Sequence, residues 1–235
     1  MILAPSSAWT PPDLEFLNRL PGLRFFSVLA RIKNDTAAFT VPTLEDLALV
    51  TGSRLSVPAG IQPLIRNLIL TDRPGINVST HWPVLESFKL GTWRGTDLQF
   101  LRDASHLRSF HVEGRRHAGS LEGVESCESL EELSTVNYSI KDTEPLRNLR
   151  SLRELRLMAA RPTASHGIID ISDLTEARIA RLWISNAQNI QQLAALARIS
   201  SLRELRLIDC RLTSEDQRLL DSLAPKVNVQ LVNAR

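Results

Sequence analysis

Two identical heptapeptides, Ser-Leu-Arg-Glu-Leu-Arg-Leu, begin at Ser151 and Ser201. Their pattern is an apolar residue, two others, an apolar residue, two others, an apolar residue, one other and a last apolar residue. This pattern recurs along the chain, and a tenth, weaker copy ends in Val229 and Leu231. Its second apolar position is filled by Leu23, Leu44, Ile65, Leu85, Leu107, Leu130, Leu152, Ile179 and Leu202. A regular repeat along almost the whole chain indicates stacked supersecondary units.

The last two apolar residues of each copy predict a short β-strand. They are two positions apart, so both side chains lie on one face of a strand and the residue between them points to the other face. A single strand of this kind cannot bury its apolar face alone. Neighbouring copies must therefore stack, with a shared core and a parallel hydrogen-bond ladder.

The repeat resembles that of leucine-rich repeat proteins, whose period is roughly 20–29 residues. The resemblance covers residues 20–232. It implies the α/β class: a curved right-handed solenoid of about ten repeats with a parallel sheet on its concave face. Short helices, 3₁₀ turns and loops would form the convex face. It also implies a small free-standing bacterial protein with one domain at 1–235, in which residues 1–20 form an N-terminal cap.

One family position departs from the expected residue type. Leucine-rich repeats keep Asn or Cys three residues after the last strand leucine, where it bonds the turn backbone. Here only Cys210 conforms, and this turn column reads Arg31, Gly52, Arg73, Trp93, Arg115, Tyr138, Ala160, Ala187 and Cys210. One place earlier stand Asp72, Asn137, Asn186, Asp209 and Asn233, which could satisfy the turn amides by a shifted route.

Three connecting segments carry helix signals. Asp13 precedes a short segment at 14–20 that we expect to be a capped helix. Apolar residues at helical spacing predict a helix over 189–198. Ser214 and Gln217 have the spacing of a capping box ahead of 218–223.

Composition excludes several classes. The apolar fraction is 43% and the charged fraction 23%, as in globular proteins. No stretch reaches eighteen apolar residues and the N-terminus lacks a secretory signal, so we expect a cytoplasmic protein without membrane contact.

Cys127 and Cys210 fall at positions that face the core, and we expect buried, reduced thiols.

No motif for catalysis, metal binding or a cofactor is present. GxGxxG, Walker A, HExxH and paired CxxC sequences are all missing. The five histidines have no Cys or carboxylate at zinc-ligand spacing. We therefore expect no metal, no cofactor and no enzymatic activity. The enzyme alternative is a composite site around His111.

The open face of the predicted sheet is the best candidate for a binding site. A Trp at the position of Trp183 has no packing reason to face away from the core. It falls between Arg156 and Arg206, and aromatic and Arg residues are enriched in interface hot spots. The predicted partner-binding residues are Lys89, His111, Glu132, Glu154, Arg156, Arg181, Trp183, Glu204 and Arg206. The alternative is a solvated face on which the charges neutralise one another across strands.

Two other surfaces are candidates. Trp93 and Tyr138 could form a lateral patch beside the strands, or fill the turn column in place of Asn. The edge strand Val227–Leu231 has an open side, which predicts a homodimer or partner contact.

These features predict a non-catalytic protein–protein interaction module of adaptor or inhibitor type, which binds a folded partner through its concave face. By analogy with small leucine-rich repeat proteins, one alternative is an immunity protein that neutralises a toxin. A lower alternative is nucleic-acid binding through residues 115–117 and the concave arginines. The net charge of +2 and the interspersed glutamates argue against it.

Overall fold

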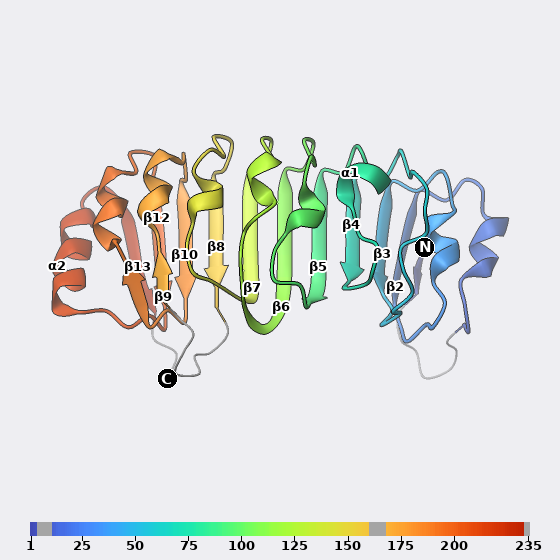
Figure 1. Cartoon of the computed structure of the whole chain (residues 1–235), viewed down its shortest axis with the longest axis horizontal. Coiled ribbons are helices and arrows are strands. Elements are labelled where there is room, and N and C mark those ends of the chain that lie inside the picture. The colour runs from blue at the N-terminus through green and yellow to red at the C-terminus, as the bar shows by residue number, and fades with distance from the viewer. Residues whose placement is uncertain (4–10, 160–167, 233–235) are drawn as a thin grey trace.

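A computed structural model describes residues 1–3, 11–159 and 168–232, with the side chains of 116 and 117 left aside. Eleven parallel strands form one sheet in chain order, confirming the predicted stacking (Figure 1). The strands are β1 (Ile2–Leu3), β2 (Phe25–Leu29), β3 (Asp46–Val50), β4 (Asn67–Thr71), β5 (Ser87–Trp93), β6 (Ser109–Gly119), β7 (Glu132–Ile140), β8 (Glu154–Met158), β10 (Arg181–Ser185), β12 (Glu204–Ile208) and β13 (Asn228–Val232).

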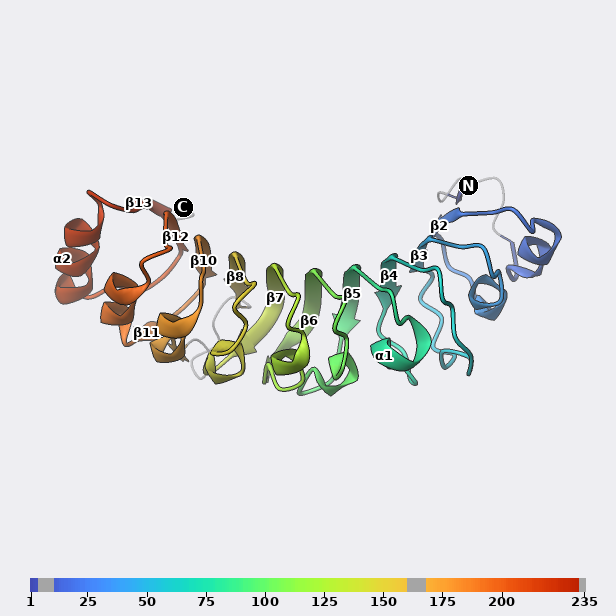
Figure 2. The same cartoon turned by 90° about the horizontal axis from the view of Figure 1, so that it is seen from above.

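The sheet lines the inner side of an arc, and helical turns lie on the outer side (Figure 2). The connections are mostly single 3₁₀ turns, because copies of about 22 residues leave little room for a full helix between strands. The α-helices are α1 (Val78–His81) and α2 (Ser214–Leu223). The 3₁₀ helices are Glu15–Arg19, Thr36–Phe39, Gln99–Leu101, Val124–Ser126, Glu144–Leu146, Ser172–Glu176 and Leu193–Arg198.

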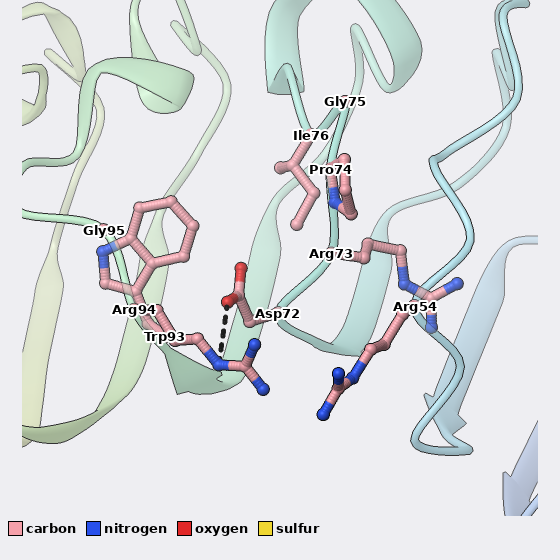
Figure 3. Close-up of a pocket in the computed structure, with 9 residues that line it drawn as sticks. All are labelled: Arg54, Asp72, Arg73, Pro74, Gly75, Ile76, Trp93, Arg94 and Gly95. Atoms are coloured by element: carbon pink, nitrogen blue, oxygen red, sulfur yellow. Dashed lines mark ion pairs between the residues drawn. The ribbon is translucent and has the colours of Figure 1, made fainter.

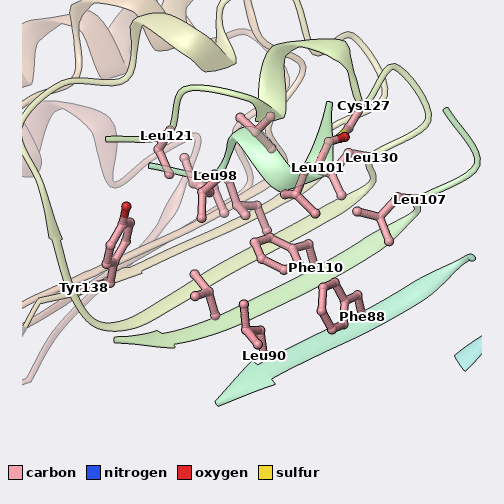
Figure 4. Packing of buried hydrophobic residues seen from close by; sticks show 14 of the residues in the cluster. Phe88, Leu90, Leu98, Leu101, Leu107, Phe110, Leu121, Cys127, Leu130 and Tyr138 are labelled. Atoms are coloured by element: carbon pink, nitrogen blue, oxygen red, sulfur yellow. The ribbon is translucent and has the colours of Figure 1, made fainter. Parts of the chain in front are cut away.

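The core fills the space between the sheet and the outer turns. Alternate strand residues are buried as the repeat predicts, and Leu205 and Leu207 of the second heptapeptide are 0% and 2% exposed. Aromatic side chains of β5 and β6, Phe88 and Phe110, pack among the leucines of the core (Figure 4). The ring of Phe88 lies 5.6 Å from that of Phe110 and 6.2 Å from that of Phe100, centroid to centroid. The predicted core position of Trp82 is confirmed by its 1% exposure.

In place of the Asn expected in the turn column, the chain uses large side chains or polar residues one place earlier. Cys210 behaves as the family residue does, because its Sγ donates to the carbonyl of Ile184 at 3.4 Å. Asn186 supports the shifted route: its amide donates to the carbonyl of Ala159 at 2.8 Å, and its φ is +59°. Asn137 and Asp209 share this left-handed backbone, which Asn and Asp tolerate better than other residues. Asn233 and Ala160 lie outside the described residues.

The predicted helix over 189–198 is wrong in its first part. Asn189–Gln191 form strand β11, which pairs in parallel with β9 (Ile168–Asp170) in a separate two-stranded sheet. Gln192 then adopts a left-handed φ of +59°, which ends the strand, and a 3₁₀ helix follows. Apolar spacing alone did not reveal this break.

The capping box of α2 lies one residue before its predicted place. Thr213 accepts a hydrogen bond from the Asp216 amide at 3.1 Å, and the Asp216 carboxylate accepts one from the Thr213 amide at 2.8 Å. The pair is Thr213 with Asp216 rather than Ser214 with Gln217, because Thr213 retains extended backbone while Ser214 is already helical.

The N-terminal segment differs from the predicted cap in two ways. The expected helix is a 3₁₀ turn, Glu15–Arg19, and Asp13, two residues before it, accepts a hydrogen bond from the Glu15 amide at 3.0 Å. In addition, β1 pairs with β2 and adds an eleventh strand. A two-residue strand with no repeat pattern around it gives no periodic signal in the sequence.

Candidate functional site

The residues on the open face of the sheet form two continuous rows across the strands. In the first row, Lys89, His111, Ser134, Arg156, Trp183 and Arg206 are successive register partners on β5, β6, β7, β8, β10 and β12. In the second row, Glu132, Glu154, Arg181 and Glu204 are successive partners on β7, β8, β10 and β12. All nine predicted site residues therefore lie on the open face of one sheet.

Trp183 lies between two guanidinium groups. The Cζ of Arg156 is 4.1 Å from the centre of the indole, and the Cζ of Arg206 is 4.6 Å from it. Both distances are within the roughly 6 Å range of a cation–π contact. The three residues form the Arg156–Trp183–Arg206 stack, which is half-buried although it faces away from the core.

A buried carboxylate holds one side of the stack in place. Glu154 forms ion pairs with Arg156 on its own strand and with Arg181 on the next strand. The Glu154 side chain is 6% exposed, whereas that of Arg181 is 51% exposed. Glu154 therefore lies beneath the surface, and a partner would contact the arginines.

The other side of the stack is held less tightly. Arg206 Nε donates to Gln230 Oε1 at 2.9 Å, and Arg206 Nη2 is 3.9 Å from Glu204 Oε1. The predicted cross-strand neutralisation is therefore present only in part: Arg181 pairs with Glu154 across strands, whereas the carboxylates near Arg156 and Arg206 lie on their own strands. These contacts orient the guanidiniums but leave them half-buried at the surface.

Two N–H donors of the stack are unsatisfied. Arg156 Nε and Trp183 Nε1 are buried without a hydrogen-bond partner among the described residues. An unpaired buried donor costs about 1–3 kcal/mol, so such groups need a reason to be present. The stack is thus not arranged solely for the stability of the free chain.

Lys89 and His111 lie apart from the stack, on the far side of β7. Lys89 is exposed and His111 is half-buried. Burial lowers the pKa of His111, and Lys89 and Arg156 lower it further, whereas Glu113 opposes them. His111 is therefore a neutral polar group at pH 7. Glu132, on β7, is exposed at the margin between the two groups.

An apolar patch on the N-terminal strands was not included in the predicted site. Its exposed members on the open face are Phe25 (42%), Leu29 (53%), Val50 (38%) and Ile69 (36%). Ala48 joins them, because it is the register partner of Ile69. The sequence could have revealed this patch, since Phe25 has the same position in its repeat as Arg181, and Ile69 has the same position as Trp183. We call these residues the apolar patch.

The predicted lateral patch of Trp93 and Tyr138 is wrong for Tyr138. Its side chain is 1% exposed, and its hydroxyl donates to the carbonyl of Ser120 at 2.8 Å. Tyr138 thus fills the turn column from inside, which is the alternative prediction (Figure 4). Trp93 is half-buried against Phe100, with 4.8 Å between ring centres, and keeps one side at the surface.

The predicted burial is confirmed for Cys127 and only partly met by Cys210. Burial raises the pKa of the Cys127 thiol to about 12 and also raises that of Cys210. Cys127 is buried and Cys210 is half-buried. Within the described ranges, no three His, Cys, Asp or Glu side chains form a group that could hold a metal ion. No helix in the part of the chain that the structure covers has the length and apolar character needed to cross a bilayer.

The parallel rows, the buried strand positions and the single-turn connections define a leucine-rich repeat solenoid. An internalin (inlF) from Listeria monocytogenes has the same fold, with a TM-score of 0.63 at 19% identity over 99% of this chain and 61% of that one. This chain therefore spans about three fifths of the length of that internalin. At such an identity the likeness shows the fold alone.

Two more solved structures resemble the chain less closely. An internalin C2 (inlC2) from Listeria monocytogenes gives a TM-score of 0.46 at 16% identity, over 95% of this chain and 76% of that one. A leucine-rich repeat protein, LIC12759, from Leptospira interrogans gives 0.48 at 11%, over 92% and 51%. No protein-family model matches the sequence, and no curated protein matches it.

Proposed function

We propose that the chain is a non-catalytic protein-binding module that holds a folded protein partner against its concave face. The observation that carries this proposal is the position of Trp183 between Arg156 and Arg206 on the open side of the sheet. Trp and Arg dominate interface hot spots because they offer a large contact area together with hydrogen-bond donors. The stack is also pre-organised, so little side-chain entropy is lost on binding.

The binding surface that we propose has two parts. The C-terminal part is the Arg156–Trp183–Arg206 stack with Arg181, Glu154 and Glu204, extended by Glu132, His111 and Lys89. The N-terminal part is the apolar patch. Contiguous exposed apolar area of this kind marks interaction sites in soluble proteins. A partner that fits would present acidic and polar groups to the stack and apolar side chains to the patch.

Capture of the native partner tests the proposal. The tagged chain is compared with a Trp183→Ala, Arg206→Ala double variant in pull-downs from the cells that encode it. The control is Arg198→Ala, an exposed arginine on the outer 3₁₀ helix Leu193–Arg198. We expect the double variant to lose capture and the control to retain it, since removal of hot-spot residues costs about 2 kcal/mol or more each. Unchanged capture by the double variant contradicts the proposal.

Adaptor, inhibitor and immunity roles differ in what the partner does once bound. Inhibition of the captured protein's activity, or protection of cells that express it as a toxin, supports the inhibitor and immunity forms. Capture without loss of that activity supports an adaptor. Nucleic-acid binding is disfavoured because Glu154 and Glu204 accompany the concave arginines, and carboxylates there would repel phosphates.

We also propose that β13 forms a contact with a second copy or with the partner. Among the described strands only β12 pairs with it, and Leu231 and Val232 are each 42% exposed. Sedimentation at increasing concentration tests this idea. A dimer that Leu231→Lys dissociates supports contact between copies, whereas a monomer whose partner capture is unaffected by Leu231→Lys contradicts both forms.

A further inference from the structure

A pocket lies at the carboxyl edge of the sheet, away from the proposed concave site. It has a volume of about 480 Å³ and is lined by the segments that follow β3, β4 and β5 (Figure 3). This volume falls within the roughly 300–1,000 Å³ usual for small-ligand sites. Its lining includes Arg54, Asp72, Pro74, Ile76, Trp93 and Arg94.

Positive charge exceeds negative charge in this pocket. Asp72 is 15% exposed and lies 3.9 Å from Arg94 Nε, measured from its Oδ2. Burial raises the pKa of Asp72, and the nearby Arg94 and Arg115 partly offset this rise. Arg54 is exposed and has no ion-pair or hydrogen-bond partner in the described part of the chain. Two lining guanidiniums, Arg54 and Arg94, thus accompany the single carboxylate of Asp72, and Arg54 has no carboxylate paired with it.

The neighbouring ion pair of Arg73 and Asp35 does not change the charge balance of the pocket. Arg73 also lines the pocket, but its guanidinium makes two 3.0 Å hydrogen bonds to Asp35, and both side chains are 0% exposed. This buried pair is neutral as a unit. Its burial keeps Asp35 from reaching Arg54 or Arg94.

Apolar groups form the rest of the wall. Trp93 packs edge-on against Phe100 and turns toward the pocket, where Pro74 and Ile76 also lie (Figure 3). Gly95 makes this arrangement possible, because a Cβ at that position would lie 2.1 Å from Trp93 Cζ2. Cationic groups beside a fixed aromatic wall suit a ligand that has both a negative charge and an apolar body.

We propose that this pocket binds a carboxylate attached to an aromatic or aliphatic body. Arg54 and Arg94 would hold the carboxylate, and Trp93, Pro74 and Ile76 would contact the apolar body. The ligand is a free organic acid or the acidic side chain of a protein segment with an apolar neighbour. This pocket is separate from the concave face, so the outcome of its test does not bear on the proposed function.

Titration with matched probes tests the proposal. The probes are 2-naphthoate, its neutral amide, and the dipeptide N-acetyl-phenylalanyl-glutamate amide, followed by ligand-observed NMR at low ionic strength. We expect 2-naphthoate to bind and the amide to bind about tenfold more weakly, because charge-assisted hydrogen bonds are lost. Tighter binding of naphthoate than of the dipeptide assigns a free acid, and the reverse assigns an acidic protein segment.

Three variants separate the pocket from non-specific attraction. Arg54→Gln should raise the Kd of 2-naphthoate about tenfold, and this exposed, unpaired residue is not needed for folding. Asp72→Asn should lower the Kd, since it removes the only negative charge among the lining residues. Arg198→Gln, on the outer face, should leave the Kd unchanged. Equal Kd values for the acid and the amide, or no effect of Arg54→Gln, overturn the proposal.

Discussion

Arg73 donates two hydrogen bonds to the carboxylate of Asp35, from Nη1 to Oδ1 and from Nη2 to Oδ2, each 3.0 Å long. Neither side chain is exposed to solvent, and Thr51 Oγ1 adds a third donor to the carboxylate at 2.6 Å. Arg73 stands in the turn column, where the family has Asn. The pair thus links the segments that follow β2, β3 and β4 from inside the solenoid.

Arg73→Met should destabilise the chain by about 3–5 kcal/mol, because it leaves the Asp35 charge buried with Thr51 as its remaining side-chain donor. Urea unfolding followed by circular dichroism measures the loss. The control is Arg66→Met, which breaks the exposed Arg66–Glu86 pair and should cost no more than about 1 kcal/mol. Equal losses in the two variants would show that the buried pair has no special role.

Stability should fall as the pH drops from the ordinary pKa of histidine toward the lower pKa of His111 in the folded chain. Burial lowers the pKa of His111 in the folded chain, so the unfolded chain binds a proton first as the pH falls. The contribution is complete above the unfolded-state pKa of about 6.5 and is lost between that value and the lower folded-state pKa. Urea midpoints at pH 7.5 and 5.5 should differ less in His111→Gln than in the parent chain. An unchanged difference contradicts the assignment.

The two thiols should resist modification while the chain is folded. Only the thiolate is nucleophilic, and burial raises the pKa of Cys127 to about 12 and raises that of Cys210 as well. With a disulfide reagent at pH 8, Cys127 in a Cys210→Ala background should react at least about 100-fold more slowly than free cysteine. In 8 M urea it should react at the free rate. Rapid labelling of the folded variant would show that Cys127 is accessible.

Glu154→Gln should weaken partner capture through its effect on the arginines, because the Glu154 side chain is only 6% exposed. The buried Glu154 carboxylate fixes Arg156 and Arg181, so its loss frees both guanidiniums to adopt other rotamers. The matched control is Glu132→Gln, the register partner on β7, which is exposed and should change capture less. If the two substitutions weaken capture equally, the carboxylates contribute through overall charge rather than by positioning.

The sequence predicted the rows of the sheet well because strand geometry alternates strictly. Once Leu182 and Ile184 are placed in the core, Trp183 must face the other way, and the repeat then sets its neighbours Arg156 and Arg206. The depth of Glu154 could not be predicted in this way. It depends on two arginines folding over it, and side-chain conformations are not encoded in the spacing of the repeat.

Contacts between different copies of the repeat also escaped prediction. Asp35 and Arg73 have no pattern that connects them, and strand β11 depends on its pairing with β9 and on the left-handed Gln192 rather than on the apolar spacing of 189–198. The sequence allows Tyr138 either in a lateral surface patch or in the turn column, and only the packing of the folded chain shows that its side chain is in the interior. Local periodicity thus defines the strands, whereas the connections follow from tertiary contacts.

Site-specific photo-crosslinking tests the central claim most directly. A benzoylphenylalanine residue replaces Arg181, which is exposed beside the Arg156–Trp183–Arg206 stack, or Arg198 on the outer face. Irradiation of the captured complex should join the partner to the chain labelled at position 181 and not to the chain labelled at 198. A crosslink from position 198 with none from position 181 would contradict binding through the concave face.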